Sequence, residues 1–413
     1  PYTDCKLMDE EEAKAKGLLK IIGNKEVDDD YIAQVKTLCI QPELLAEEGS
    51  KLSIVYTPIH GSGNVPVRRI LREVGISNVS VVKEQELPDP NFSTVKVPNP
   101  EDPGAFVLAI KLADEVGAKV IFATDPDCDR LGVAVKTGNG DWQLLTGNQI
   151  GSLLAWYRCM SMSGLGIIND SNRSRAVMVK TFVTTGLQDA IGHHFGYEVV
   201  NVLTGFKYIA QKLGKYEEAI PAEKREGYRK MSEEQTRALR LEYSRYFVFG
   251  GEESYGYLSG TSVRDKDAVN AAVLVCEMAA NYKAQGLTLL DKLEQLREEF
   301  GFYAQRLLTF QYEGESGAAK MADIMRKLRA PLDTFQDAHF PTATRIDYQN
   351  DETGLPKSDV LSFALADGSK IIVRPSGTEP KLKAYLFARG ENQVAAEKVL
   401  DELETLMNGY CKE

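Results

Sequence analysis

A short apolar run that ends in a crowd of carboxylates constrains the fold of this chain more than any other stretch. Residues Lys119–Thr124 are mostly apolar and partly β-branched, which predicts a buried strand. Pro126 cannot donate to a sheet ladder, so the strand should end before it, and Leu131–Val135 begins a second apolar strand. Between the strands lie three aspartates at alternate positions, followed at once by an arginine. Such crowding raises the mutual repulsion of the carboxylates and calls for a compensating cation.

The three carboxylates, Asp125, Asp127 and Asp129, are predicted to bind a divalent ion. Mg2+ suits them because it takes few carboxylates and completes its shell with phosphate or water. A plain acidic turn is the alternative, but the buried strand before the aspartates and the arginine after them favour the metal. An EF-hand loop is excluded, because the sixth position counted from Asp125 is Arg130 instead of Gly and the twelfth is Lys136 instead of Glu.

The pattern along the chain predicts an α/β protein: two related α/β domains with mixed or parallel sheets, followed by a smaller α+β C-terminal domain. Around the aspartate loop, strands alternate with helices as in a parallel sheet. The same order recurs, with Thr57 and Thr181 at similar distances before an acidic loop, which indicates a duplication. A charged segment at 216–245 is interpreted as a solvated helical excursion. The predicted parts are a connector over 1–50, α/β domains over 51–165 and 166–300, and an α+β domain over 301–413.

Composition disfavours several classes of function. The chain has 413 residues, too many for one core, and its formal net charge of −11 disfavours binding to nucleic acid or to anionic membranes. Its six cysteines are scattered without a CxxC pair, which is typical of a reducing compartment and gives no zinc or disulfide framework. No apolar run approaches the roughly 18 residues of a membrane span, and the N-terminus shows no signal-peptide pattern. These observations predict a cytoplasmic protein.

Two further loops carry chemistry at strand ends, where ligands of α/β sheets gather. The strand Tyr246–Phe249 leads into Glu252–Ser254, whose carboxylates and hydroxyl can read the vicinal hydroxyls of a sugar; a solvated acidic turn is the alternative. The loop Arg374–Lys381 combines an arginine fork, hydroxyls and a glycine turn that suit a phosphate, although it is also compatible with a plain turn. Lys266 is either a helix-start charge or a phosphate contact. His60 either faces a cleft or makes a structural hydrogen bond.

Together these loops resemble those of the α-D-phosphohexomutase superfamily, the phosphoglucomutase and phosphomannomutase enzymes. The resemblance rests on a DPDCDR loop, a GEESYG loop and an RPSGTEP loop in this order, and it covers residues 50–413. The GEES form is most similar to phosphoglucomutases. The resemblance implies an isomerase that interconverts glucose 1-phosphate and glucose 6-phosphate through a phosphoserine, with Mg2+ as cofactor and glucose 1,6-bisphosphate as activator and intermediate. It also implies that the three domains correspond to family domains 2, 3 and 4.

The resemblance assigns roles to individual residues. Asp125, Asp127 and Asp129 would bind Mg2+, and Arg130 would be the catalytic residue that faces the phosphate in transit. Nine further residues would hold the substrate: Thr204 and Gly205 at the sugar, Glu252 and Ser254 at its hydroxyls, Lys266 beside it, and Arg374, Ser376, Gly377 and Thr378 at the phosphate that is not reacting.

One expected element is missing from these residues. The superfamily transfers phosphate through a serine in a TASHNP-type motif of its first domain, and this sequence contains no Ser-His-Asn. The phosphoserine would also complete the Mg2+ site. We therefore expect a chain without the N-terminal phosphoserine domain that binds phosphosugars but is inactive alone. We also expect weak self-association through the surface that the domain would cover. Alternatives are a phosphomannomutase, a non-catalytic phosphosugar-binding module, and a Mg2+-dependent phosphatase that uses an aspartate of the loop as nucleophile.

Overall fold

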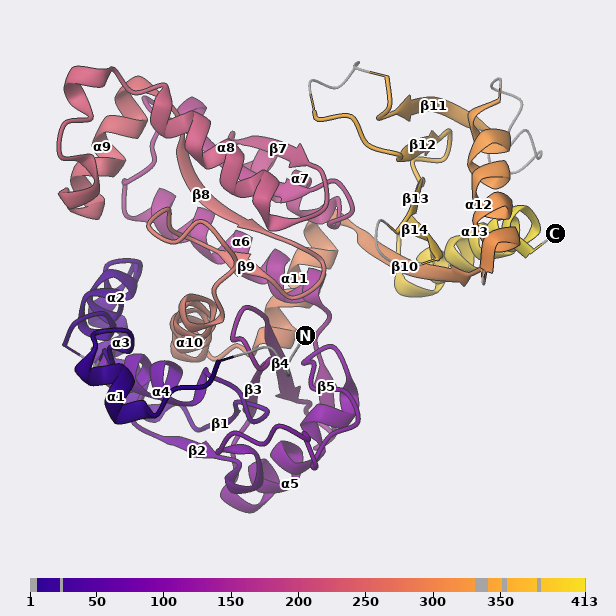
Figure 1. Cartoon of the computed structure of the whole chain (residues 1–413). Helices are drawn as coiled ribbons and strands as arrows, with labels where there is room; N and C mark the ends of the chain where they lie inside the picture. The colour runs from indigo at the N-terminus through magenta and orange to yellow at the C-terminus, as the bar shows by residue number, and fades with distance from the viewer. Residues whose placement is uncertain are drawn as a thin grey trace.

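The computed structural model describes residues 6–22, 25–312, 314–330, 341–350, 355–376 and 380–412. Two α/β units come first in the chain, and a C-terminal sheet domain follows them (Figure 1). The strand β10 (Phe302–Gln311) leads from the second unit into the C-terminal domain. No helix in the described part of the chain is long and apolar enough to cross a bilayer.

The first α/β unit is built on a mixed five-stranded sheet. Its elements are β1 (Ile54–Thr57), α4 (Asn64–Glu73), β2 (Val79–Val81), α5 (Val107–Val116), β3 (Val120–Thr124), β4 (Leu131–Lys136) and β5 (Trp142–Leu144). The strand order is β2-β1-β3-β4-β5, with β1 parallel to β2 and β3, and β4 antiparallel to β3. The apolar run predicted as a strand forms β3, whose residues from Ile121 onward are buried, as in a sheet covered on both faces.

Helices from the predicted connector pack on this unit. They are α2 (Asp28–Lys36) and α3 (Pro42–Glu48), whereas α1 (Glu10–Ala15), which precedes them, buries none of its residues. α3 is separate from α2 and begins at Pro42, which is tolerated in the first turn of a helix because its missing N–H costs nothing there. Ile32 and Val35 of α2 and Leu45 of α3 are buried in the same core as β1 and α4. The segment thus contributes to the first core and does more than connect.

The second α/β unit repeats the strand order of the first. Its elements are α6 (Gly147–Gly164), β6 (Ala176–Thr181), α7 (Leu187–His194), β7 (Glu198–Val202), α8 (Phe206–Glu218), α9 (Glu233–Tyr243), β8 (Tyr246–Gly251), β9 (Tyr257–Leu258), α10 (Ala268–Ala284) and α11 (Leu289–Phe300). In the order β7-β6-β8-β9, β6 is parallel to β7 and β8, and β9 is antiparallel to β8. The arrangement matches β2-β1-β3-β4, which confirms the predicted duplication. The loops after β3 and β8 therefore occupy equivalent positions.

The helix α6 was not expected from the sequence. A capping box of Thr146 and Gln149 begins it, and almost all of its residues are buried, so it lacks the apolar stripe of an amphipathic helix. It packs against α7 and β8, although the predicted boundary at residue 165 assigns these residues to the first unit. Its first residue, Gly147, lies so close to the carbonyl oxygen of Glu253 that a Cβ there would clash.

A polar cluster lies in the interior where α10 meets α3 and α6. Glu277 of α10 is fully buried, and its Oε1 accepts the backbone N–H of Gln41 at 2.5 Å. Arg158 of α6 is also buried, and its Nε donates to the carbonyl oxygen of Val248 at 2.7 Å. Burial raises the pKa of Glu277 to about 7. Buried apolar residues from Ile32 to Leu296 form one continuous core around this cluster.

Replacing Glu277 with glutamine should flatten the pH dependence of stability. Between the ordinary pKa of 4.5 and about 7, the folded chain binds more protons at Glu277 than the unfolded chain. The free energy of unfolding therefore falls as pH rises through this window. Glutamine still accepts the N–H of Gln41 and carries no charge, so Glu277→Gln should be about 1–3 kcal/mol more stable than the parent near pH 8.

Urea unfolding measured at several pH values between about 5 and 8 checks this expectation. The matched control is Glu298→Gln on α11, whose carboxylate is exposed, and its stability curve should follow that of the parent. Parallel curves for Glu277→Gln and the parent would show that Glu277 stays ionised in the folded state.

The C-terminal domain is an antiparallel sheet covered by two helices. It consists of β10, α12 (Gly314–Arg329), β11 (Thr342–Asp347), β12 (Leu361–Leu365), β13 (Lys370–Pro375), β14 (Lys381–Gly390) and α13 (Gln393–Lys412), with strand order β10-β14-β13-β12-β11. Apolar residues of α12 and α13 form one core with the sheet. On the other face, Ile372, Tyr385 and Phe387 pack with Phe182 and Leu203 of the second unit. The domain therefore has its own core and a smaller contact with the rest of the chain.

Candidate functional site

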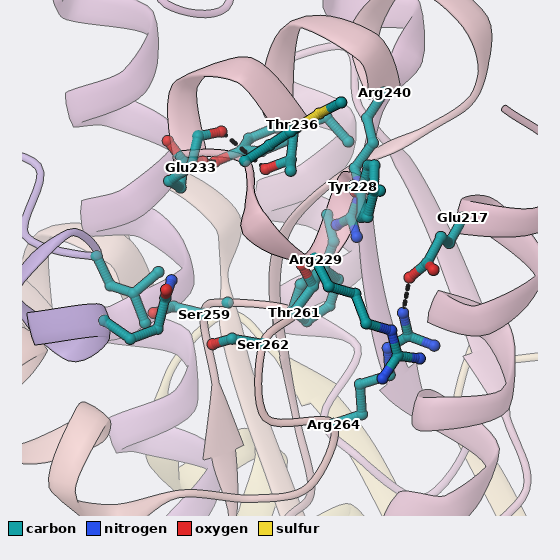
Figure 2. A pocket seen from close by; sticks show the side chains of 16 residues that line it. Glu217, Tyr228, Arg229, Glu233, Thr236, Arg240, Ser259, Thr261, Ser262 and Arg264 are labelled. Atoms are coloured by element: carbon teal, nitrogen blue, oxygen red, sulfur yellow. Dashed lines mark hydrogen bonds and ion pairs between the residues drawn. The ribbon is translucent and has the colours of Figure 1, made fainter. Parts of the chain in front are cut away.

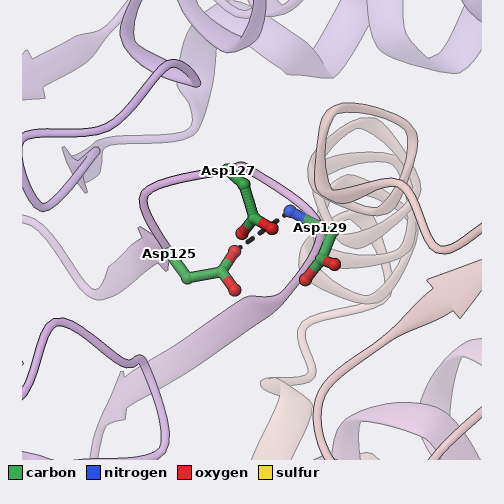
Figure 3. A group of neighbouring side chains, drawn as sticks. All are labelled: Asp125, Asp127 and Asp129. Carbon is green, nitrogen blue, oxygen red and sulfur yellow. Dashed lines mark hydrogen bonds between the residues drawn. The ribbon is translucent and has the colours of Figure 1, made fainter. Parts of the chain in front are cut away.

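The loop between β3 and β4 brings the three aspartates together. One carboxylate oxygen from each of Asp125, Asp127 and Asp129 lies within 4.8 Å of the others, and Figure 3 shows the three groups around one small volume. Asp125 shapes the loop, because its Oδ1 accepts the backbone N–H groups of Asp129 at 3.0 Å and Arg130 at 2.9 Å. Cys128 adopts a left-handed conformation with φ of 59°, which turns the chain back within the loop.

The donor set fits a hard divalent cation. All three groups are carboxylates, and the buried Oδ1 of Asp129 accepts no hydrogen bond. Burial, together with the charges of Asp129 and Asp127, raises the pKa of Asp125 to about 7. A bound cation would supply the missing partner and favour the ionised carboxylates. Asp125, Asp127 and Asp129 would hold Mg2+, which stabilises negative charge on a phosphoryl group when it is bound.

Two cations flank the aspartates. The Nη1 of Arg130 lies 2.8 Å from Oε1 of Glu101, and its Nε lies 3.7 Å from Oδ2 of Asp125. The Nζ of Lys266 lies 2.7 Å from Oδ2 of Asp129. Lys266 thus lies beside the aspartates, and its predicted contact with a phosphate stays a prediction. Glu101 was not foreseen, because it lies in a loop rich in proline and asparagine whose sequence carries no signal for it.

Replacing Lys266 with methionine should tighten metal binding to the chain in the absence of sugar. The ammonium group competes with a metal ion for the carboxylate of Asp129, and a partly exposed pair of this kind is worth roughly 0.2–1 kcal/mol. We expect Lys266→Met to raise the affinity for Mn2+ about two- to fivefold in a titration followed by electron paramagnetic resonance. Weaker binding would show that Lys266 supports the loop of the three aspartates instead of competing with the ion.

The second loop follows β8 and holds Glu252 against the start of α8. The Oε1 of Glu252 accepts the backbone N–H of Gly205 at 2.9 Å, and burial raises the pKa of this carboxyl group. Glu253 points elsewhere, because its Oε2 accepts a hydrogen bond from the hydroxyl of Thr181 at 3.2 Å. Ser254 is half-buried. Of the two glutamates, only Glu252 is thus placed beside the Thr204–Gly205 turn.

The loop after β3, which carries the three aspartates, and the loop after β8, which carries Glu252, are bonded directly to each other; in view of the chemistry predicted for them, they are called the metal loop and the sugar loop below. The backbone N–H of Leu131 donates to the carbonyl oxygen of Tyr255 at 3.0 Å, and Arg130 and Gly256 form an antiparallel bridge. The N–H of Ala268, the first residue of α10, donates to the carbonyl oxygen of Cys128 at 3.2 Å. The equivalent loops of the two repeats therefore face each other and form one surface.

The third loop contributes an arginine to the same region. Arg374 lies near the end of β13, and its Nη1 donates to the hydroxyl of Thr204, while its buried Nε has no hydrogen-bond partner. The backbone N–H of Ser376 donates to the carbonyl oxygen of Lys381 at 2.7 Å. The predicted contacts Gly377 and Thr378 lie outside the described residues. The described part of the loop thus brings Arg374 to the turn that also contacts Glu252.

The ring nitrogens of His60 lie 2.9 Å from the carbonyl oxygen of Leu87 and 2.8 Å from the hydroxyl of Thr94, so the structural reading of His60 holds. The hydroxyl of Tyr31, which the sequence did not single out, lies 2.8 and 2.9 Å from the carboxylate oxygens of Asp267. It thereby ties α2 to the residue that follows Lys266.

Comparisons with known proteins identify the family. Models of the phosphoglucomutase/phosphomannomutase family match in chain order: alpha/beta/alpha domain II at residues 29–138, alpha/beta/alpha domain III at 146–300 and the C-terminal domain at 313–405. A protein named "Probable phosphomannomutase" from Haemophilus influenzae is 33% identical over 386 residues, which cover 93% of this chain and 68% of the relative. The chain belongs to the phosphoglucomutase/phosphomannomutase family. The predicted superfamily and fold class are thereby confirmed.

Other members of the phosphoglucomutase/phosphomannomutase family agree with this assignment. A phosphoglucomutase from Staphylococcus epidermidis is 34% identical over 390 residues, covering 92% of this chain and 64% of the relative. The crystal structure of the phosphoglucomutase pp63/parafusin from Paramecium has a TM-score of 0.63 at 16% identity, covering 93% of this chain and 63% of that one, and supports the fold. The chain thus spans about two thirds of the length of these relatives.

Proposed function

We propose that this chain supplies the metal, sugar and phosphate contacts of a phosphoglucomutase, which interconverts glucose 1-phosphate and glucose 6-phosphate through glucose 1,6-bisphosphate. The observation that carries the proposal is the bonding between loops of three domains. Arg374 reaches Thr204, the adjoining Gly205 binds Glu252, and Leu131 beside the metal loop binds Tyr255 of the sugar loop. Relatives named phosphoglucomutase support the same activity.

Each loop has a task that its chemistry suits. Arg374 offers a planar fork with a free buried Nε, which is suited to grip a phosphate in two places. Glu252 accepts hydrogen bonds and can hold the hydroxyls of the sugar ring. Arg130 beside the aspartates neutralises charge on a phosphoryl group as it moves, and the fixed positions of these groups supply much of the catalysis of phosphoryl transfer.

The proposed reaction also needs a group that carries the phosphoryl between the two ends of the sugar. By the resemblance this is a phosphoserine in a Ser-His-Asn motif, which residues 1–413 do not contain. We therefore propose that these residues bind glucose 1,6-bisphosphate and Mg2+. The phosphoryl carrier would be a serine outside them.

Calorimetric titration with glucose 1,6-bisphosphate in the presence of Mg2+ tests the proposed function. We expect saturable binding that Glu252→Gln weakens about tenfold, since one charge-assisted hydrogen bond to the sugar is lost. A coupled assay with glucose 1-phosphate should show no turnover by residues 1–413 alone. Failure to bind the bisphosphate would overturn the proposal, and turnover without an added domain would overturn the assignment of the phosphoryl carrier.

The same titration with mannose 1,6-bisphosphate tests whether the chain prefers glucose over mannose. The Haemophilus influenzae relative is named for mannose, whereas the Glu252-Glu253 pair of this chain resembles phosphoglucomutases. We expect glucose 1,6-bisphosphate to bind more tightly than mannose 1,6-bisphosphate, and the reverse order would favour a phosphomannomutase.

A further inference from the structure

A cavity lies on the second α/β unit, and none of the candidate site residues lines it. It has a volume of about 380 Å³, and its walls come from the charged segment 216–245, the residues Ser259–Arg264 after β9, and the helix α2 (Figure 2). Most of the charged segment is exposed or half-buried, as a solvated excursion should be, but Tyr228 and Arg240 within it are buried. The segment therefore folds onto the domain and closes a polar hollow.

The guanidinium group of Arg240 lies in the wall of this cavity without a counter-charge. Only 3% of Arg240 is exposed, and its Nε donates to the hydroxyl of Tyr228 at 2.5 Å. Its Nη2 is buried and has no hydrogen-bond partner, and no carboxylate pairs with Arg240 among the described residues. An unpaired buried charge is costly, so this group favours an anion in the cavity.

Two further arginines add positive charge to the same cavity. Figure 2 shows Arg229 and Arg264 extending toward the same end, where Glu217 pairs with Arg264. Arg229 has no ion-pair partner in the part of the chain that the structure describes. Glu233, the other carboxylate in the lining, forms an ion pair with Arg237 and accepts a hydrogen bond from the hydroxyl of Tyr246. The cavity thus keeps an excess of positive charge in a chain whose net charge is −11.

The cavity also offers hydroxyl groups on a loop that leads to the candidate site. Thr261 and Ser262 line it, and the same loop continues to Lys266, whose Nζ lies 2.7 Å from Oδ2 of Asp129. Arginine forks and hydroxyl groups together are the chemistry that recognises a phosphate. Only a few residues of this loop therefore separate a group of side chains suited to bind phosphate from Lys266, which contacts the aspartates.

We propose that this cavity binds a small phosphorylated metabolite and that its occupancy regulates metal and substrate binding at the three loops. A phosphate between Arg229, Arg240 and Arg264 draws Arg264 away from Glu217 and shifts the loop that carries Lys266. The change in the Lys266–Asp129 pair then alters the affinity of the aspartates for their ion. The regulatory part rests on the proposed function, whereas the binding part does not.

Calorimetry without divalent metal tests the binding part, with inorganic phosphate and 3-phosphoglycerate as probes. All titrations use the Arg374→Ala background, which removes the phosphate contact of the candidate site, and 3-phosphoglycerate lacks the sugar ring that Glu252 would hold. We expect 3-phosphoglycerate to bind, and a further Arg229→Ala substitution to weaken it about tenfold. The side chain of Arg229 is exposed, so this variant should fold normally.

Lys230→Ala is the matched control, since it removes the same charge from the neighbouring residue, whose side chain does not line the cavity. It should change the affinity less than twofold, as expected for a surface charge. Absence of binding in the Arg374→Ala background, or equal effects of Lys230→Ala and Arg229→Ala, would overturn the proposed site.

The regulatory part has its own readout, which does not depend on turnover. We expect saturating 3-phosphoglycerate to change the affinity of the Arg374→Ala chain for Mn2+ at least about twofold, and Arg229→Ala to abolish this change. Binding of 3-phosphoglycerate without any change in Mn2+ affinity would overturn the regulatory part and leave the site. Both results come from binding measurements, so they can be obtained even if residues 1–413 catalyse no sugar isomerisation.

Discussion

Replacing Asp127 with asparagine should lower the affinity of the chain for Mg2+ or Mn2+ at least about a hundredfold, since loss even of a group that only orients a ligand costs 10- to 100-fold. Asp127 is exposed, whereas Asp125 also accepts two backbone N–H groups of the loop. The Asp127→Asn variant therefore removes a charged ligand and keeps the hydrogen bonds that shape the loop. Electron paramagnetic resonance of Mn2+ measures the affinity directly and requires no turnover.

The control for this prediction is Asp141→Asn, which removes an exposed carboxylate from the turn between β4 and β5 of the same sheet. Its affinity for Mn2+ should equal that of the parent. An unchanged affinity in Asp127→Asn would mean that the three aspartates form an acidic turn and that the ion binds elsewhere.

Replacing Arg374 with alanine should weaken the binding of glucose 1,6-bisphosphate about a hundredfold. Two charge-assisted hydrogen bonds to one phosphate together contribute roughly 3 kcal/mol, which corresponds to this factor in Kd. The free buried Nε and the Nη1 that now contacts Thr204 are both available to a phosphate. Arg374→Lys should recover only part of the affinity, because an ammonium group cannot form the planar fork.

The control here is Arg326→Ala on α12, whose arginine belongs to the same domain and has a side chain that is 75% exposed. It changes the net charge by the same amount and should leave the affinity unchanged. If Arg326→Ala and Arg374→Ala weaken binding equally, the effect of Arg374 is a general effect of charge and the third loop does not grip the phosphate.

The architecture was largely predictable because its signals are local. Buried strands of parallel sheets are short apolar runs, and β3 and β8 stand out in the sequence for this reason. The repeated order of strands and helices then fixes which loops share an edge of the sheet. The helix α6 escaped prediction because it is buried on nearly all sides, and a helix without a polar face has no periodic pattern to reveal it.

The candidate site was predictable where one loop supplies several polar groups, as with the three aspartates and Glu252. Contacts between loops could not be predicted from the sequence, because they depend on how the domains pack against each other. The pairing of Lys266 with Asp129 and of Arg130 with Glu101 are examples. The charged segment 216–245 is helical and largely exposed, as predicted, but nothing in its sequence indicated that Tyr228 and Arg240 within it would be buried.

The continuous apolar core from Ile32 to Leu296 joins the two α/β units, whereas the C-terminal domain has a core of its own. Cooperative unfolding follows shared cores more closely than it follows repeats or domain names. On heating, the two repeats should therefore melt together in a single calorimetric peak, and the C-terminal domain should give a second one. The two repeats, although distinct in topology, then unfold as one cooperative unit. The metal loop and the sugar loop should therefore lose their structure at the same temperature.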